Sequence, residues 1–160
     1  MGADHHLGEL VKTFQSIAEM QSFVGQSIGV SDWITVTQER IQLFADATGD
    51  HQWIHLDPER AKQGPFGATI AHGFLTLSLL PEMAASAFSV EGTKMGVNYG
   101  LNKVRFPAPV PSGSRLRGHF KLLKYEPLEG GAQVTVEVTM EREGSDKPVC
   151  VAESVGRRFG

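Results

Sequence analysis

The sequence predicts an α+β domain in which an antiparallel sheet wraps around one buried helix. Residues 72–90 are apolar on nearly every side of a helix, as expected of a helix with no face toward solvent. After residue 115, apolar and polar residues alternate with a period of two, which indicates antiparallel strands with one buried face. A sheet with one apolar face must pack that face against another element, and the buried helix provides the partner surface.

The composition is that of a single globular domain. The chain has 160 residues, 41% of them hydrophobic and 21% charged, which argues against disorder. Its net charge of −3 lacks the basic excess of a dedicated nucleic-acid binder, so no nucleic-acid partner is expected. Its one cysteine, Cys150, cannot form an intrachain disulfide. Together with a polar N-terminus and the lack of a long apolar run, this predicts a cytoplasmic protein without a membrane span.

Residues 1–24 are predicted to form an N-terminal extension with one short amphipathic helix, because apolar residues recur there at helical spacing. These residues are Phe14, Ile17, Met20 and Phe23. Residues 25–160 then form the domain itself. The apolar content of residues 28–36 predicts its first strand.

A capped helix and a long loop are expected next. Thr37 is the predicted N-cap of this helix, and Gly49 is its predicted stop. The apolar face between them consists of Ile41, Phe44 and Ala47. Residues 49–70 are rich in Gly, Pro, Asp and His, which is typical of a loop, and only residues 58–62 are expected to form a turn of helix.

The buried helix is predicted over residues 72–90, where Pro81 should kink or split it because proline lacks the N–H donor and crowds the preceding turn. Four strands are expected to follow. They cover residues 97–106, 115–122, 133–140 and 149–159. Because a sheet of this size leaves its edges exposed, we expect the chain to form a homodimer by edge pairing.

The densest polar cluster lies in residues 50–57, and three interpretations of it compete. A metal site would use His51 and His55, but Gln52 stands where zinc peptidases carry Glu, and no metal is expected. General acid–base catalysis would use Asp50 and His55, which have the side-chain types needed to hold and activate one water. In the third interpretation, Asp50 caps a turn and His55 is a hydrogen-bonded, partly buried histidine.

Gly73 stands at the start of the predicted buried helix. Backbone N–H groups at such a position are unpaired within the helix, and the helix dipole favours negative charge there. A glycine lets a ligand approach closely, and its N–H could donate to a carbonyl oxygen that gains negative charge during a reaction. A tight turn without any ligand explains the residue equally well.

Three segments taken together resemble the MaoC-like dehydratase family of hotdog-fold proteins, which includes (R)-specific enoyl-CoA hydratases and the NodN-like branch. The segments are residues 44–57 (FADATGDHQWIHLD), 71–74 (AHGF) and 98–111 (NYGLNKVRFPAPVP). The last of them is similar to the NodN-like and mycobacterial hydratase branch. The resemblance covers residues 25–160. It implies a hotdog fold, in which an antiparallel sheet wraps a long central helix, and members usually dimerise so that two sheets join.

The resemblance also implies a reaction and its site. Asp50 and His55 would add water in syn fashion across the double bond of a trans-2-enoyl-CoA thioester, giving an (R)-3-hydroxyacyl-CoA. His55 would take a proton from water, and Asp50 would protonate the α-carbon. The N–H of Gly73 would polarise the thioester carbonyl. Further substrate-binding positions implied in this way are His72, Phe74, Asn98 and Tyr99.

The implied reaction needs no metal or redox cofactor. Two other functions remain open at this point. A thioesterase on the same fold would use a carboxylate to direct water at the carbonyl carbon, and such enzymes often lack the histidine. A non-catalytic protein that binds acyl thioesters would need neither side chain, because a fold does not dictate a function.

Overall fold

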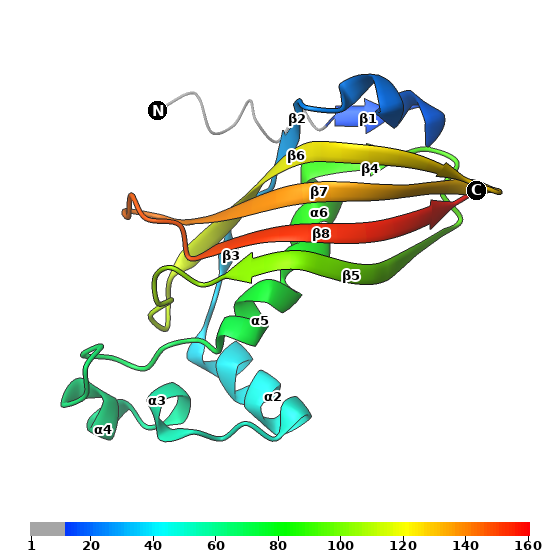
Figure 1. The fold of residues 1–160 in the computed structure, drawn as a ribbon. Coiled ribbons are helices and arrows are strands. Elements are labelled where there is room, and N and C mark those ends of the chain that lie inside the picture. Colours follow the sequence, from blue (N-terminus) through cyan, green and yellow to red (C-terminus); the bar gives the residue numbers. More distant parts are fainter. Residues whose placement is uncertain (1–11) are drawn as a thin grey trace.

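A curved six-stranded antiparallel sheet forms most of the fold (Figure 1). The computed structural model describes residues 12–160. The strands of the sheet are β2 (Ser27–Val30), β3 (Ile34–Thr35), β5 (Met95–Arg105), β6 (Arg115–Leu128), β7 (Gly131–Arg142) and β8 (Cys150–Phe159). Their order is β2-β6-β7-β8-β5, with β3 also paired to β6, so β5 forms one edge of the sheet. The predicted antiparallel sheet is therefore confirmed.

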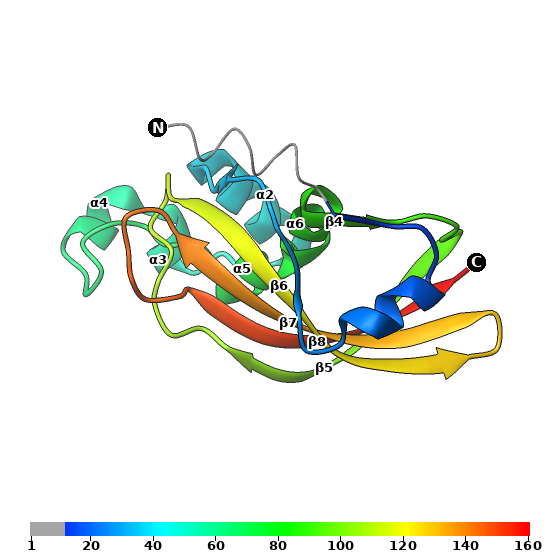
Figure 2. The same ribbon diagram turned by 90° about the horizontal axis from the view of Figure 1, so that it is seen from above.

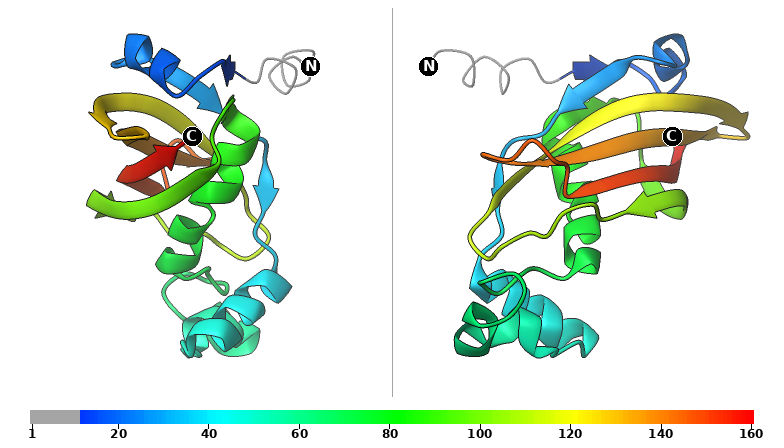
Figure 3. Two further views of the ribbon diagram at one scale, coloured as in Figure 1. Left: turned by 90° about the vertical axis from the view of Figure 1, so that its right-hand side faces the viewer. Right: turned by 60° about the vertical axis from the view of Figure 1, so that its left-hand side comes forward.

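Two consecutive helices, α5 (Gly73–Ser78) and α6 (Leu80–Ala87), lie inside the curve of this sheet, as Figures 2 and 3 show from three directions. The predicted split occurs beside Pro81, because α5 ends at Ser78 and α6 begins one residue before the proline. Proline is tolerated in the first turn of a helix, where N–H groups have no intrahelical acceptor. We call α5 and α6 together the central helix pair.

The helix predicted to continue to residue 90 ends earlier than expected. Residues Phe88–Val90 form strand β4 instead, which pairs in parallel with β1 (Lys12–Phe14). The prediction was wrong there because it rested on local apolar content, whereas the pairing joins segments more than seventy residues apart.

The described part of the predicted N-terminal extension packs onto the domain. After β1, the 3-10 helix η1 (Ala18–Phe23) forms near the predicted amphipathic helix. Phe14 and Met20 are fully buried within the main hydrophobic core. Residues 1–11 of the predicted extension lie outside the described residues, and the domain boundary at residue 25 stays a prediction.

The core lies between the central helix pair and the concave face of the sheet. Alternate residues of β6 and β7 point into it, as the period-two pattern predicted. The buried side chains from these strands include Leu116, Phe120, Leu122, Val138 and Met140. Burying one large apolar side chain contributes roughly 1.5–3 kcal/mol to the free energy of unfolding, so this layer supplies much of the stability.

Three short helices lie beyond one end of the central helix pair (Figure 1). The first, α2 (Gln38–Thr48), confirms the predicted caps, because the Thr37 hydroxyl accepts a hydrogen bond from Arg40 N and Gly49 has φ 85°. The predicted turn at residues 58–62 is helix α4 (Pro58–Lys62). The loop prediction was wrong for Trp53–Leu56, which form helix α3, because a four-residue helix is too short to show a periodic pattern.

The first predicted strand, residues 28–36, is interrupted in the middle. Ser31 still pairs with Gly118 of β6, but the backbone N–H of Asp32 donates to the Ser86 hydroxyl of α6 instead of to the sheet. The segment therefore forms two short strands, β2 and β3, on either side of this contact. None of the described helices is long and apolar enough to cross a membrane.

Gly29 allows the closest contact between the sheet and the central helix pair. It lies at a register shift in the pairing of β2 with β6, and its φ is 152°. A Cβ at this position would overlap the carbonyl of Ala87, the last residue of α6.

We predict that Gly29→Ala lowers the free energy of unfolding by about 1–3 kcal/mol, because the backbone of either α6 or β2 must move. Urea denaturation followed by circular dichroism would measure this. Gly156→Ala is a matched control, since its Cβ would make only an ordinary contact of 3.6 Å with Val97 O. Equal stabilities of the two variants would contradict the prediction.

Candidate active site

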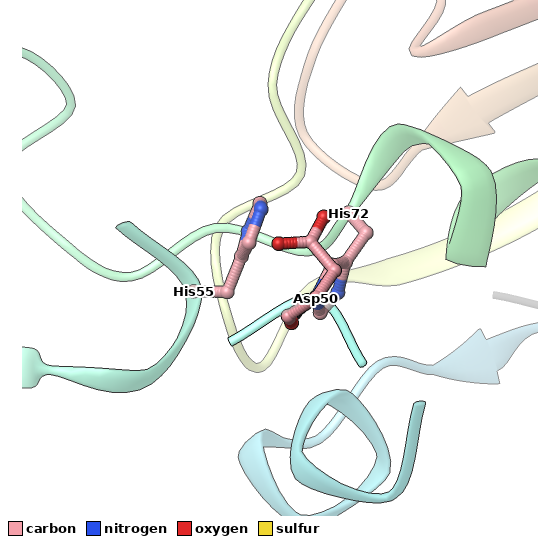
Figure 4. Close-up of side chains that lie close together, drawn as sticks. All are labelled: Asp50, His55 and His72. Atoms are coloured by element: carbon pink, nitrogen blue, oxygen red, sulfur yellow. Dashed lines mark hydrogen bonds between the residues drawn. The ribbon is translucent and has the colours of Figure 1, made fainter. Parts of the chain in front are cut away.

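Three polar side chains meet where the short helices approach the start of α5. Asp50 follows α2, His55 lies in α3, and His72 is the N-cap residue of α5. One potential ligand atom from each lies within 4.8 Å of the other two. Figure 4 shows the Asp50 carboxylate beside the His55 ring, with His72 behind them. The structure thus brings together the two residues expected to be catalytic and one expected to bind substrate.

His55 is held in one orientation by the backbone. Its Nδ1 lies 2.7 Å from the carbonyl oxygen of Ile70. Because a carbonyl oxygen can only accept, Nδ1 carries the proton and Nε2 keeps a free lone pair. The side chain is only 6% exposed, and this burial lowers the pKa of His55 below its ordinary value. The ring is therefore neutral near pH 7 and can accept a proton at Nε2.

Hydrogen bonds also fix the position of the backbone around His55. Gln38 of α2 donates from Nε2 to the carbonyl oxygen of His55 at 2.7 Å, and the Thr69 hydroxyl donates to Gln38 Oε1 at 2.7 Å. Ile70 N donates to Ile54 O at 3.0 Å. Sequence reasoning missed Gln38, Thr69 and Ile70, and no spacing signal could have identified them because two of these bonds use backbone carbonyls.

His72 contacts both Asp50 and His55, and its expected role in substrate binding stays a prediction. Its ring stacks on that of His55 with 3.8 Å between centroids and 24° between planes, and Phe44 covers it at 4.8 Å. Its Nε2 donates to the backbone carbonyl oxygen of Asp50 at 3.0 Å. The ring is 3% exposed, and its Nδ1 has no hydrogen-bond partner among residues 12–160. These contacts position both Asp50 and His55.

The Asp50 carboxylate faces solvent. Its Oδ1 accepts a hydrogen bond from Gln52 N at 3.3 Å, as in a turn stabilised by an aspartate side chain. Asp50 therefore stabilises a turn, as the third interpretation of the sequence predicted. Its exposed carboxylate is also accessible to a ligand.

The geometry does not suit a metal ion. Asp50, His55 and His72 are close enough together, but a zinc ion must lie about 2.1 Å from each ligating nitrogen, along its lone pair in the ring plane. The two imidazole rings are stacked, so their lone pairs run side by side and do not converge. The alternative pair also fails, because His51 is exposed and bonds to Asp46 at 3.0 Å, away from buried His55.

The other expected substrate-binding residues lie at two different places. Gly73 is the first residue of α5, and a Cβ there would lie 3.1 Å from the Phe106 ring. Phe74 is 70% exposed and meets the edge of Phe106 with 6.3 Å between centroids. Asn98 and Tyr99 lie on β5, where they line a cavity beside residues 77–81, further along the central helix pair. A role for these residues in substrate binding stays a prediction.

Known proteins resemble this chain in both sequence and structure. Residues 19–144 match the family model described as MaoC like domain. The chain is 59% identical over 148 residues to 3-hydroxyacyl-thioester dehydratase Z of Mycobacterium tuberculosis (strain ATCC 25618 / H37Rv), covering 92% of this chain and 98% of that protein. It is 51% identical over 141 residues to nodulation protein N of Rhizobium leguminosarum bv. viciae, covering 86% of this chain and 87% of that protein.

A solved structure is similar as well. R-hydratase PhaJ1 from Pseudomonas aeruginosa, in the unliganded form, superposes with a TM-score of 0.71 and 26% identity, covering 88% of this chain and 83% of that one. The resemblance and the α+β hotdog fold predicted from the sequence are thereby confirmed. With a family model that spans most of its length and relatives above half identity, the chain belongs to the MaoC-like dehydratase family.

Proposed function

We propose that this chain catalyses the reversible addition of water to trans-2-enoyl-CoA thioesters, giving (R)-3-hydroxyacyl-CoA. The dehydratase and R-hydratase named among its relatives support this class of reaction on an acyl thioester. The observation that carries the proposal is the His55 ring, which lies beside the Asp50 carboxylate and whose Nδ1 is bonded to Ile70 O, so that Nε2 is left to accept a proton.

In the proposed reaction, a water molecule lies between Asp50 and His55. In the reacting form, His55 is neutral and Asp50 carries a proton. His55 Nε2 takes one proton from the water as the water oxygen bonds to the β-carbon, and the Asp50 carboxyl group gives its proton to the α-carbon on the same face, leaving Asp50 as a carboxylate. The proton gained by His55 then returns through solvent to Asp50, which is exposed. The backbone N–H of Gly73 donates to the thioester oxygen, which gains negative charge as the bond forms. No step requires a metal or a redox cofactor.

We also propose that the chain works as a homodimer in the cytoplasm. Among the described residues, no strand pairs with the outer side of β5, and this edge carries large exposed apolar side chains, which favours pairing with a second copy. They are Met95, Val97, Tyr99 and Leu101. Cys150 is a buried free thiol, as is common in reducing compartments.

The central test is hydration of crotonyl-CoA, followed by loss of enoyl absorbance with chiral analysis of the product. We expect (R)-3-hydroxybutyryl-CoA, and we expect Asp50→Asn and His55→Gln each to lower kcat by at least ~100-fold, because each removes a proton-transfer group. Release of free CoA instead would indicate a thioesterase. Binding without either reaction would indicate a non-catalytic acyl-thioester-binding protein.

The matched control for these variants is His51→Gln, which changes an exposed neighbour bonded to Asp46 and should leave kcat within about twofold. Circular dichroism must show that every variant is folded. A strong chelator should leave the rate unchanged, because the stacked imidazoles do not converge on one ion. Full activity in folded Asp50→Asn and His55→Gln proteins would refute the assigned roles.

The pH dependence follows from the lowered pKa of His55. The neutral ring is the active base, so the fall in kcat/KM on the acid side should be centred below about pH 6.5, the ordinary histidine pKa. A pH series of crotonyl-CoA hydration would locate this acid limb. The same decrease in kcat/KM at low pH should be seen in His51→Gln. A decrease centred above pH 6.5 would argue against a buried histidine as the base.

The dimer can be tested by sedimentation equilibrium. We expect twice the mass of one chain for the native protein and a shift toward one chain for Leu101→Lys, which places a charge on the β5 edge. Leu43→Lys is a matched control, because Leu43 is 63% exposed on α2 and away from that edge. A monomeric native protein would overturn the dimer proposal.

A further inference from the structure

A pocket runs along the central helix pair, between it and strands β5 and β8. Two adjoining cavities of about 410 Å³ and about 310 Å³ make up this pocket. Their walls have residues in common, so the two cavities lie next to each other. The common residues are Leu80, Pro81, Asn98 and Ser154. We call the two cavities together the helix pocket.

The helix pocket extends away from the catalytic pair. Gly73, next to His72, begins α5, whereas Phe88, just past the end of α6, lines the far cavity. At a helical rise of 1.5 Å per residue, these two positions are about 22 Å apart along the central helix pair. Gly73 itself lines a separate cavity beside Phe106, and the near cavity of the helix pocket begins one turn of α5 further on, at Leu77 and Ser78. A long acyl chain on a thioester held at Gly73 would pass this turn to reach the near cavity and then the far one.

Two consecutive arginines of β8, Arg157 and Arg158, contribute to the otherwise largely apolar wall of the far cavity. Arg158 of β8 lines it, and its guanidinium lies 5.4 Å from the centre of the Phe88 ring. Ala84, Val136 and Val138 are among the apolar residues around it. Arg158 is partly buried, and this burial lowers its pKa, yet an arginine remains charged at any physiological pH.

Among residues 12–160, no group pairs with the charge of Arg158. Within residues 12–160, its side chain makes no ion pair and no hydrogen bond, whereas four other arginines pair with carboxylates or amides. The neighbouring Arg157, for example, donates to Gln133 Oε1 at 2.9 Å and stacks over the Tyr99 ring. A partly desolvated guanidinium without a partner is unfavourable, and a carboxylate that accepts two hydrogen bonds from it would offset that cost.

We propose that the helix pocket takes an acyl chain that ends in a carboxylate, and that Arg158 binds this carboxylate. The apolar wall would cover the methylene groups, and the guanidinium would select the charged end. This inference rests on the proposed function, because it places the thioester of the same substrate at Gly73 and His55. It adds a substrate class, the ω-carboxyacyl thioesters, to that function.

The test compares two series of trans-2-enoyl-CoA substrates that differ only in a terminal methyl or a terminal carboxylate. At one long chain length, we expect kcat/KM to favour the carboxylate by on the order of tenfold or more, since hydrogen bonds between charged groups are strong. Arg158→Met, which keeps the length of the side chain without its charge, should abolish this preference. Arg142→Met should keep the preference, because Arg142 is far from the cavity. Arg142 is the last residue of β7, whereas Ala132, which pairs with Arg158, lies near the first residue of that strand.

The outcomes separate this proposal from the proposed function. Hydration of crotonyl-CoA together with a preference for the terminal methyl at every length would overturn the carboxylate site alone. If no enoyl-CoA is hydrated, calorimetry with saturated acyl-CoA and ω-carboxyacyl-CoA decides instead. Tighter binding of the carboxylate form would support the site, and equal affinities would overturn it. Because the native protein carries this comparison, the test holds even if Arg158→Met does not fold.

Discussion

The hydrogen bond between His55 Nδ1 and the carbonyl of Ile70 sets the chemistry of the candidate site. It leaves Nε2 as the only basic atom of the ring, and it stops the ring from turning away from Asp50. Ile70 can hold the His55 ring in place because the backbone of Ile70 itself bonds to two other segments. Its N–H donates to Ile54, and it forms a bridge with Pro111 just before β6. The short helices, the entry to α5 and the sheet are thus joined at one residue.

The shape of the helix pocket depends on where the core is filled and where it is not. Toward β2 and β6, large side chains such as Met83 and Leu122 occupy the space beside the central helix pair. Toward β5 and β8, the wall includes small residues, among them Ala84, Gly96 and Gly156. Close-packed interiors leave voids only where side chains are small, so a cavity forms on this side. Of these two strands, β5 is the open edge of the sheet, and substrate entry and dimer formation would therefore involve neighbouring surfaces.

The sequence predicted the elements that have strong local signals. The caps of α2, the split beside Pro81 and the alternating strands β6 and β7 are examples, since each depends on residues close together in the chain. The predictions were wrong where contacts between segments far apart in the chain decide the local structure. Residues 88–90 became a strand because β1 lies beside them, and the strand over residues 28–36 broke where Ser86 takes the N–H of Asp32. Helix α3 was not predicted because it is only one turn long.

For the site, the sequence by itself determined which side chains are present and suggested the pair Asp50 and His55 through its family resemblance. Only the tertiary structure decided how they act. The tautomer of His55, its lowered pKa and the stacking of His72 all arise from groups 15 or more residues away. Local spacing carries no information about such contacts, and burial is a property of the whole fold. Arg158, which has no side-chain partner among residues 12–160, is the same case, because the sequence gives an arginine in a strand no role until the cavity in front of it is known.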